Sequence, residues 1–162
     1  MYIMKSVTSS HKEHYQFCTL TGYDELVIHL SSAAGEWLAG TTKTTDGYVV
    51  GNRTLFCDLL SRMEMAPVVG TGFRRPQSLN AGQAQYSELQ LQAEWGIGRK
   101  VVRRLLDEME QVGLIKVEKS TVASTLTFPC IRSWRLNDIV IVNPYHYFFN
   151  SNECINEKGG QQ

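Results

Sequence analysis

The sequence predicts an α+β fold, in which a small β-rich N-terminal extension precedes three helices and a β-hairpin. Two amphipathic segments joined by a glycine-containing turn occupy residues 87–112. Alternating apolar and polar residues follow over residues 114–130, the pattern of half-buried strands. We therefore expect an N-terminal extension at 1–46, a main domain at 47–150 and a disordered tail at 151–162.

The N-terminal extension is rich in residues that favour strands. Residues 15–20 and 25–30 are expected to form a hairpin across a Thr-Gly-Tyr-Asp turn. Residues 33–39 are predicted to form a short helix, and residues 40–47 a polar loop rich in threonine. Three roles stay open for this part of the chain: packing on the main domain, pairing across a dimer, and contact with a partner.

The first helix of the main domain is predicted over residues 53–63, with Asn52 as its cap. Apolar residues recur there at helical spacing: Leu55, Phe56, Leu59, Leu60 and Met63. Residues 66–82 then form a connection punctuated by Gly and Pro, and loops of that length are often functional. Arg74 and Arg75 in this loop are candidates for gripping a nucleic-acid backbone, and solubility explains them equally well.

The next two helices are predicted on either side of Gly96-Ile97-Gly98. Ser87 begins a capping box with Gln90, in which side chains satisfy amide groups left bare at a helix start. The second helix of the pair runs from Arg99 to Val112, and Gly113 suits a left-handed exit. Its apolar residues fall within an arc of about 120° and require a core: Val102, Leu105, Leu106, Met109 and Val112.

A β-hairpin is predicted directly after this helix. Its first strand covers residues 114–117 and its polar turn residues 119–124. In its second strand three apolar residues alternate with two threonines: Leu126, Phe128 and Cys130 with Thr125 and Thr127. Residues 83–86 are expected to add a small third strand before the helix pair. Three helices with such a hairpin constitute a winged helix-turn-helix, whose second paired helix can enter the DNA major groove.

The face of the second paired helix that points away from the core is charged. Four cations occupy its first turn and a half, and acidic residues follow, although a helix dipole favours the reverse order. Stability alone therefore does not explain the layout, and the alternative is a solvated face with weak salt bridges. We expect nine residues to contact double-stranded DNA: Ser87, Arg99, Lys100, Arg103, Arg104, Gln111, Lys119, Arg74 and Arg75. The DNA-binding hypothesis requires the cations to face solvent, neither paired with carboxylates nor covered by the N-terminal extension.

Several of these segments resemble a known family. The runs GQAQYS (82–87), WGIGRKVVRRLL (95–106) and EQVGLI (110–115) are similar to winged-helix domains of phage and plasmid replication proteins, namely replisome organisers and primosome-type initiators. IVNPYHYFF (141–149) resembles a strand end of some small plasmid replication initiators. The resemblance implies a DNA-binding fold, a role in the replication or maintenance of a mobile element, and replication proteins as partners.

Two positions depart from this family. Gly98 replaces the usual Ser or Thr, which removes a side-chain cap. Val101 replaces a polar residue that often reads a base edge, and valine cannot form such a hydrogen bond. We therefore expect phosphate contacts to supply most of the affinity. A transcriptional regulator on the same scaffold is one alternative function. Another is a protein-assembly module or homodimer, with the aromatic residues near 145–149 and the N-terminal hairpin forming the contact.

Composition restricts the remaining classes. The 162 residues include 16 basic and 16 acidic ones, so overall charge does not favour nucleic acid. Residues 71–104 alone hold six cations against Glu88 and Glu94, a local net charge of +4. A mean hydropathy of −0.22, without a long apolar run or a leader-like start, predicts a cytoplasmic protein that does not enter a membrane.

Enzymatic and metal-binding motifs are weak. Gly70-Thr-Gly72 lacks the rest of a phosphate loop, and no nucleophile has motif context, so we expect neither an enzyme nor a cofactor. His11, His14 and Cys18 give a spacing that could suggest a metal site, but no fourth ligand lies nearby in the sequence. His29 is expected to be a strand residue. The four scattered cysteines include no C-x-x-C pair, and we expect reduced, partly buried thiols.

Overall fold

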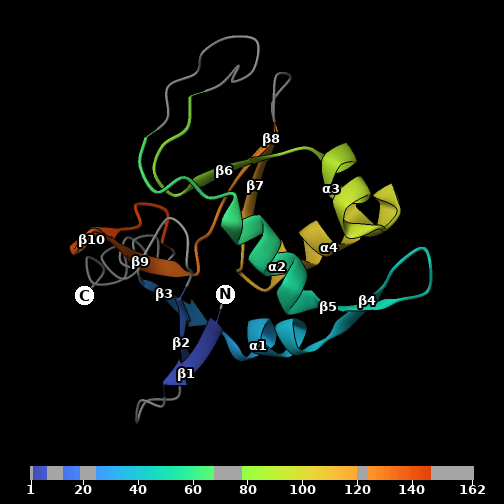
Figure 1. Cartoon of the computed structure of the whole chain (residues 1–162), viewed down its shortest axis with the longest axis horizontal. Helices are drawn as coiled ribbons and strands as arrows, with labels where there is room; N and C mark the ends of the chain where they lie inside the picture. The colour runs from blue at the N-terminus through green and yellow to red at the C-terminus, as the bar shows by residue number, and fades with distance from the viewer. Residues whose placement is uncertain (1, 7–12, 19–24, 68–77, 120–123, 147–162) are drawn as a thin grey trace, which may run out of the picture.

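The structure is a computed structural model that describes residues 2–6, 13–18, 25–67, 78–119 and 124–146. Its helices are α1 (Ser32–Ala39), α2 (Asn52–Ser61), α3 (Glu88–Trp95) and α4 (Arg99–Gln111). Its strands are β1 (Tyr2–Ser6), β2 (Glu13–Cys18), β3 (Glu25–Leu30), β4 (Thr41–Lys43), β5 (Val49–Gly51), β6 (Gln83–Tyr86), β7 (Lys116–Lys119), β8 (Ser124–Thr127), β9 (Ile131–Leu136) and β10 (Ile139–Val142). Figure 1 shows α2 near the middle, with α3 and α4 to its right and β9 and β10 to its left.

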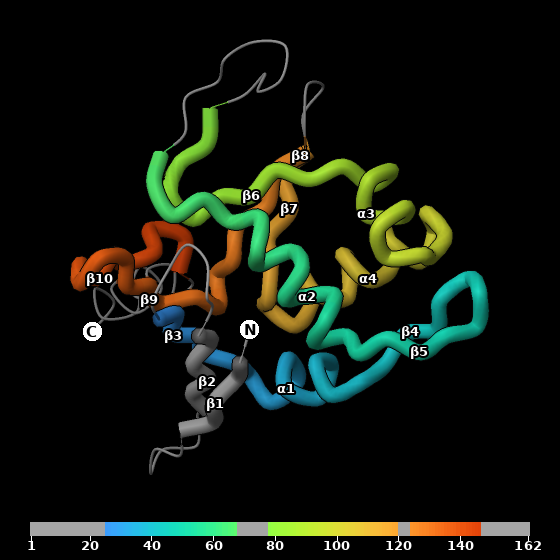
Figure 2. Tube along the Cα trace, in the orientation of Figure 1, coloured from blue at the N-terminus to red at the C-terminus, as the bar shows by residue number. Residues whose placement is uncertain are grey.

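The strands form three antiparallel sheets. The largest has the order β1-β2-β3-β9-β10, β4 pairs with β5, and β6-β8-β7 make the third. The pairing of β3 with β9 joins the N-terminal part of the chain to its C-terminal part, since Leu26 lies opposite Trp134. The tube in Figure 2 shows the same closure, with the blue β3 segment beside the orange β9 segment.

The predicted winged helix-turn-helix is wrong. Over the residues that the structure describes, the fold is α+β with four helices and three small antiparallel sheets, and this strand-rich arrangement is not a three-helix core carrying a hairpin wing. The physical reason lies in burial. Leu26 and Ile28 of β3 have no exposed surface, and α1 buries Ala34 and Leu38, so the N-terminal elements belong to the core cluster.

The hairpin predicted after the helix pair is formed by β7 and β8, and β6 adds the expected third strand. β8 is the central strand of its sheet, with β6 on one side and β7 on the other. Side chains on both faces of β8 are buried, with Thr125 and Thr127 at 4% and 3% exposure and Leu126 at 0%.

One hydrophobic cluster connects the helices to the sheets. Phe56 of α2 meets Phe128 edge to face, with ring centroids 6.0 Å apart. Val102, Leu105 and Met109 of α4 join the same cluster and are almost completely buried. Burying each such side chain contributes about 1.5–3 kcal/mol, so α4 is held firmly by its apolar side.

Several local predictions are confirmed. Residues 25–30 pair with β2 as a hairpin, and the helix expected near 33–39 is α1. The strand expected at 83–86 is β6. The loop expected at 40–47 instead begins with β4, because Thr42 is buried and donates a hydrogen bond of 2.6 Å to Oδ1 of Asn52.

The role expected of Asn52 is also different. Gly51 is the N-cap of α2, and no side chain caps this helix start. The Asn52 amide donates to the carbonyl of Trp37 at 2.9 Å, and its oxygen accepts the Thr42 bond. A buried amide is most stable where both its donor and its acceptor are used, so Asn52 ties α1 to β4 rather than capping α2.

Some predictions fall on residues outside the described part of the chain. They include Arg74 and Arg75 of the 66–82 connection, and the side chains of His11, His14 and Cys18, the set considered for a metal site. They also include residues 120–123 of the hairpin turn, residues 147–149 of the aromatic segment, and the tail at 151–162 that was predicted to be disordered.

Candidate nucleic-acid interface

The helix pair α3–α4 begins and turns as its sequence predicts. The Ser87 hydroxyl caps α3 by accepting from the Gln90 amide at 3.4 Å. Gly96 leaves α3 in the left-handed region, with φ of +64°, which glycine adopts without strain. Gly98 is the N-cap of α4 and can supply no side-chain bond to the amides of the first turn. Those amides are a preferred place for an anion.

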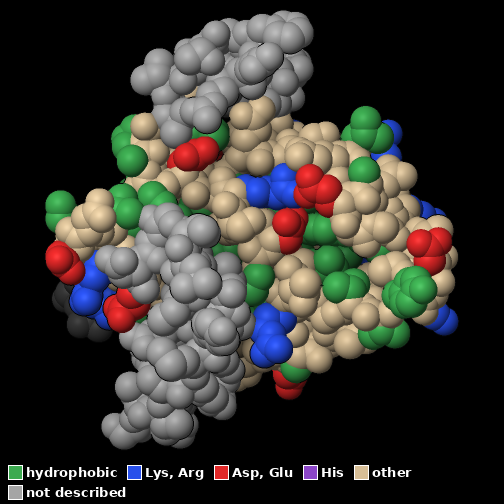
Figure 3. All heavy atoms as spheres, viewed as in Figure 1, with side chains coloured by type: hydrophobic (Ala, Val, Ile, Leu, Met, Phe, Trp, Pro, Cys, Tyr) green, Lys and Arg blue, Asp and Glu red, His purple; other side chains and the backbone are tan. Residues whose placement is uncertain are grey.

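Helix α4 has one buried face and one charged face. Arg99, Arg103 and Arg104 are 63%, 52% and 60% exposed in their side chains, and Lys100 is exposed as well. Lys119, at the end of β7, adds a fifth cation that is 66% exposed. We call these five residues the basic cluster. Figure 3 shows small groups of Lys and Arg atoms along the right-hand edge of the molecule, where α3, α4 and the β4–β5 hairpin lie, with an acidic group among them.

Three members of the basic cluster converge on one carboxylate. Oε2 of Glu88 accepts from Nε of Arg103 at 2.9 Å and from Nε of Arg99 at 3.1 Å. Oε1 of the same residue lies 3.7 Å from Nζ of Lys119. Glu88 itself is only 15% exposed in its side chain. The expectation of cations without carboxylate partners is therefore wrong, and Arg104 is paired as well, with Glu108. This removes one of the two conditions that the sequence-based DNA-binding hypothesis required. The other condition holds, because the side chains of these cations are still 52–66% exposed.

The environment of Glu88 favours its charged form. Partial burial works to raise the pKa of this carboxyl group, but the hydrogen bonds from Arg99 and Arg103 outweigh burial and lower the pKa below its ordinary value. Glu88 is therefore ionised at neutral pH, and the group of Arg99, Arg103, Lys119 and Glu88 carries a net charge of +2.

The N-terminal elements hold the other end of α4. The indole nitrogen of Trp37 in α1 donates to Oε2 of Glu108 at 2.9 Å. The Ser31 hydroxyl donates to the carbonyl of Val112 at 3.4 Å. Both contacts lie in the second half of α4 or beyond it, and Arg104 makes an i,i+4 ion pair of 3.4 Å with the same Glu108. These contacts leave the start of α4 accessible.

Helix α3 is braced against α2 by a polar network. Oδ2 of Asp58 accepts from the indole nitrogen of Trp95 at 2.8 Å and from Arg62 at 3.1 Å. Arg62 also pairs with Glu94 of α3. Here the cation is the shielded partner, since Arg62 is 16% exposed and its acids are 34% and 43% exposed, whereas around Glu88 the carboxylate is the shielded partner. The Trp95–Asp58 hydrogen bond joins α3 to α2, and Glu94, whose side chain is 43% exposed, adds an ion pair at the surface.

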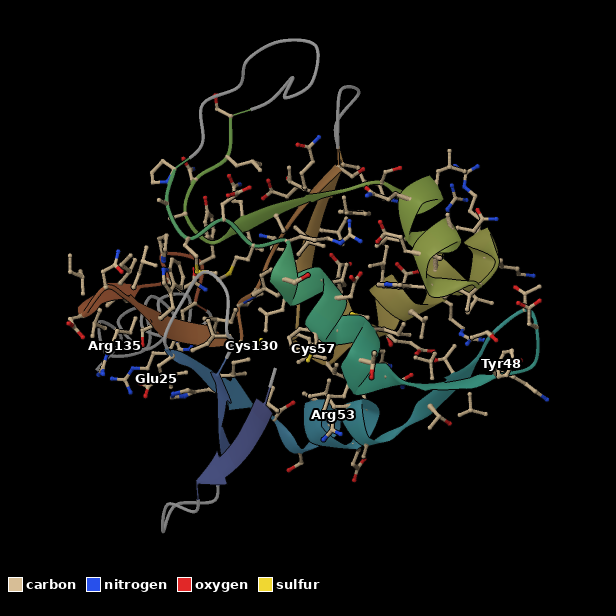
Figure 4. The ribbon with its side chains drawn as sticks, viewed as in Figure 1. Glu25, Tyr48, Arg53, Cys57, Cys130 and Arg135 are labelled. Atoms are coloured by element: carbon tan, nitrogen blue, oxygen red, sulfur yellow. The ribbon has the colours of Figure 1, made fainter. Side chains whose placement is uncertain are left out.

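The hairpin of β4 and β5 is a neighbour that the sequence did not predict. The amide of Thr45 donates to the carbonyl of Gly96 at 2.9 Å, so the hairpin tip contacts the turn between α3 and α4. Tyr48 near this tip is 75% exposed and projects from the hairpin in Figure 4.

The predicted site residues do not all come together. Arg99, Lys100, Arg103, Arg104 and Lys119 form the basic cluster, whereas Ser87 serves as a helix cap. Gln111 is exposed but ends α4, about 18 Å along the helix from its first residue at 1.5 Å per residue. Glu88 was missed, because its partners lie 11 to 31 positions away in the sequence and no local pattern connects them.

The described residues contain no group of three or more side chains arranged to hold a metal ion. Cys57 and Cys130, both labelled in Figure 4, are free thiols; Cys57 is half-buried and Cys130 is buried. Burial raises the pKa of Cys57 to about 11 and that of Cys130 still further, which makes both thiols poor nucleophiles. In the same part of the chain no helix combines the length and apolarity needed to cross a membrane.

The chain matches no protein-family model, and comparison with curated proteins and solved structures finds no significantly similar sequence or structure.

Proposed function

We propose that this protein binds double-stranded DNA through the basic cluster, and that it serves the replication or maintenance of a phage, plasmid or other mobile element. The observation that carries the first part is the start of α4, where four exposed cations lie within six residues of a helix whose other side is buried. The second part is supported by the sequence resemblance of residues 82–115 and 141–149, and it stays a prediction.

The chemistry of the basic cluster suits phosphates better than bases. Guanidinium groups match phosphate oxygens in geometry and charge. Val101 is half-buried and packs against the core, so it is not placed to replace a base-reading polar side chain. Affinity that comes from phosphate contacts depends steeply on salt, with a log–log slope of about −0.9 for each phosphate neutralised.

The test is a titration of a labelled 25-base-pair duplex by fluorescence anisotropy, between about 50 and 200 mM salt. We expect micromolar binding at low salt and a slope that the Arg103→Gln variant makes shallower by about one contact. Arg135→Gln is the matched control, since it removes the same charge from β9, across the molecule from α3 in Figure 4. Absence of micromolar binding at 50 mM salt, or an equal loss in both variants, would contradict the proposal.

Footprinting separates the two DNA-binding roles. Protection of repeated origin-type sequences supports replication, and protection at a promoter supports the alternative of a transcriptional regulator.

A second candidate function is assembly with another protein. β10 is an edge strand of the five-stranded sheet, and three of its side chains are apolar and more than half exposed: Ile139, Val140 and Val142. Exposed apolar edge strands favour pairing with another chain. A stable dimer in light scattering, combined with no DNA binding, would favour this function over the first.

A further inference from the structure

Glu88 sits where an anion bound by the basic cluster would sit. It is the first residue of α3, and its carboxylate accepts from two guanidinium groups of α4 and lies near the ammonium group of β7. The three cations come from two different elements, so they meet only because the fold brings them around this carboxylate. More than half of the surface of each of these three side chains is still exposed to solvent.

The carboxylate and a DNA phosphate compete for the same donors. Both present anionic oxygens to guanidinium N–H groups, and each guanidinium has five such groups. The bonds to Glu88 use Nε of Arg99 and of Arg103, which leaves four N–H groups on each for a second anion. A phosphate that reaches them must lie close to the Glu88 charge or displace it, and like charges at that range repel.

We infer that Glu88 is an internal competitor that takes the place of one DNA phosphate in the free protein and thereby limits affinity for DNA. The inference rests on the proposed function and adds to it a residue that sets affinity and salt dependence without contacting a base. A purely structural role for Glu88 gives the opposite expectation, because loss of the carboxylate would then loosen Arg99 and Arg103 and weaken binding.

The discriminating variant is Glu88→Gln, measured in the full chain with the same labelled duplex and salt range. We expect binding about three- to tenfold tighter at low salt, and a log–log slope steeper by about one contact because cations released from Glu88 become available. Glu94→Gln is the matched control. It removes the same charge from the same helix, but Glu94 pairs with Arg62 and not with the basic cluster, so less than a twofold change is expected.

Glu88→Asp is a second variant that keeps the inference testable if Glu88→Gln does not fold. It keeps a negative charge in the first turn of α3 and withdraws the carboxylate by one methylene group, so affinity should fall between wild type and Glu88→Gln.

The outcomes separate the two proposals. If the wild type binds DNA and loses affinity in Arg103→Gln, while both Glu88 variants bind no more tightly than the wild type, this inference is overturned and the proposed function stands. If Glu94→Gln tightens binding as much as Glu88→Gln, overall charge explains the effect and the inference also falls. If the wild type does not bind DNA at all, both fall together.

Discussion

Replacing Asn143 with alanine should be among the most destabilising single changes in the described part of the chain outside the apolar core. Asn143 follows β10 and is completely buried. Its amide donates to the carbonyls of Phe128 and Ile131, both at 2.9 Å, and its side-chain oxygen accepts from the amide of Tyr145 at 3.0 Å. One side chain thus closes the turn between β8 and β9 and also fixes the chain after β10.

The cost of Asn143→Ala follows from these three bonds. The Phe128 carbonyl keeps a second donor, the amide of Ile131 at 3.0 Å, so it is not left bare. The Ile131 carbonyl and the Tyr145 amide each lose this side-chain partner. With about 1 kcal/mol for each net hydrogen bond and more for a buried group left unsatisfied, we expect the free energy of unfolding to fall by about 2–3 kcal/mol. For a chain of this size that corresponds to about 5–10 °C in Tm.

Urea unfolding followed by tryptophan fluorescence measures this loss, as a lower midpoint with an unchanged slope. Asn80→Ala is the matched control, because Asn80 also contacts Tyr145, through an exposed bond of 3.0 Å to the phenol oxygen. Its loss should change the stability by less than about 0.5 kcal/mol. An Asn143→Ala variant as stable as Asn80→Ala would refute the reasoning.

Three further outcomes are expected. Cys57 should react with iodoacetamide at pH 8 about 100-fold more slowly in the folded than in the unfolded protein, measured at that residue by mass spectrometry, because its pKa is raised to about 11. Folding lowers the pKa of Glu88, so its carboxylate should stabilise the folded state fully at pH values above the ordinary pKa of 4.5 and lose this effect as the pH falls through the folded pKa. The urea midpoints of wild type and Glu88→Gln should therefore converge in acid. A constant difference between them would contradict this. Gly98→Ser should stabilise the protein by about 0.5–1 kcal/mol, because serine can cap α4, the backbone is extended there, and a Cβ meets no atom within 4 Å. Gly98→Asp should also stabilise the protein, but its negative charge should weaken DNA binding.

The features predicted correctly from the sequence are those set by neighbouring residues. The Ser87 cap, the left-handed Gly113 with φ of +80° and the buried stripe of α4 each depend on residues a few positions apart. Local spacing determines which side of a helix is apolar, so these features can be read directly from the chain.

The overall fold was predicted wrongly because it depends on pairings between distant residues. β3 pairs with β9, more than a hundred positions later, and no pattern in the sequence of either strand identifies the other as its partner. Asn52 shows the same limit on a smaller scale. Its sequence context favours a helix cap, but the folded chain offers its amide two better partners in Trp37 and Thr42. Propensity is a weak guide where tertiary contacts compete with it.

The sequence predicted the cations of the candidate site but not its acidic residue, Glu88. Arg99 and Arg103 are conspicuous because they gather at one helix start. Glu88 looks like an ordinary first-turn residue of α3, where a negative charge is favourable in any case. Only the packing of α3 against α4 turns this carboxylate into their common partner.

The order of charges along α4, which opposes the helix dipole, has an explanation in what surrounds each half. In the second half, Glu108 accepts from the indole of Trp37, and Glu110 accepts from the amide of Val117, so acids stand where α1 and β7 need acceptors. In the first half, the dipole penalty of the arginines is offset by Glu88 of a neighbouring helix. Stability and the proposed DNA binding are therefore expected to depend on different ends of one helix. Changes at Glu108 should mainly loosen the N-terminal elements, whereas Arg103→Gln should change affinity for DNA and leave the free energy of unfolding within about 1 kcal/mol, as expected for an exposed ion pair.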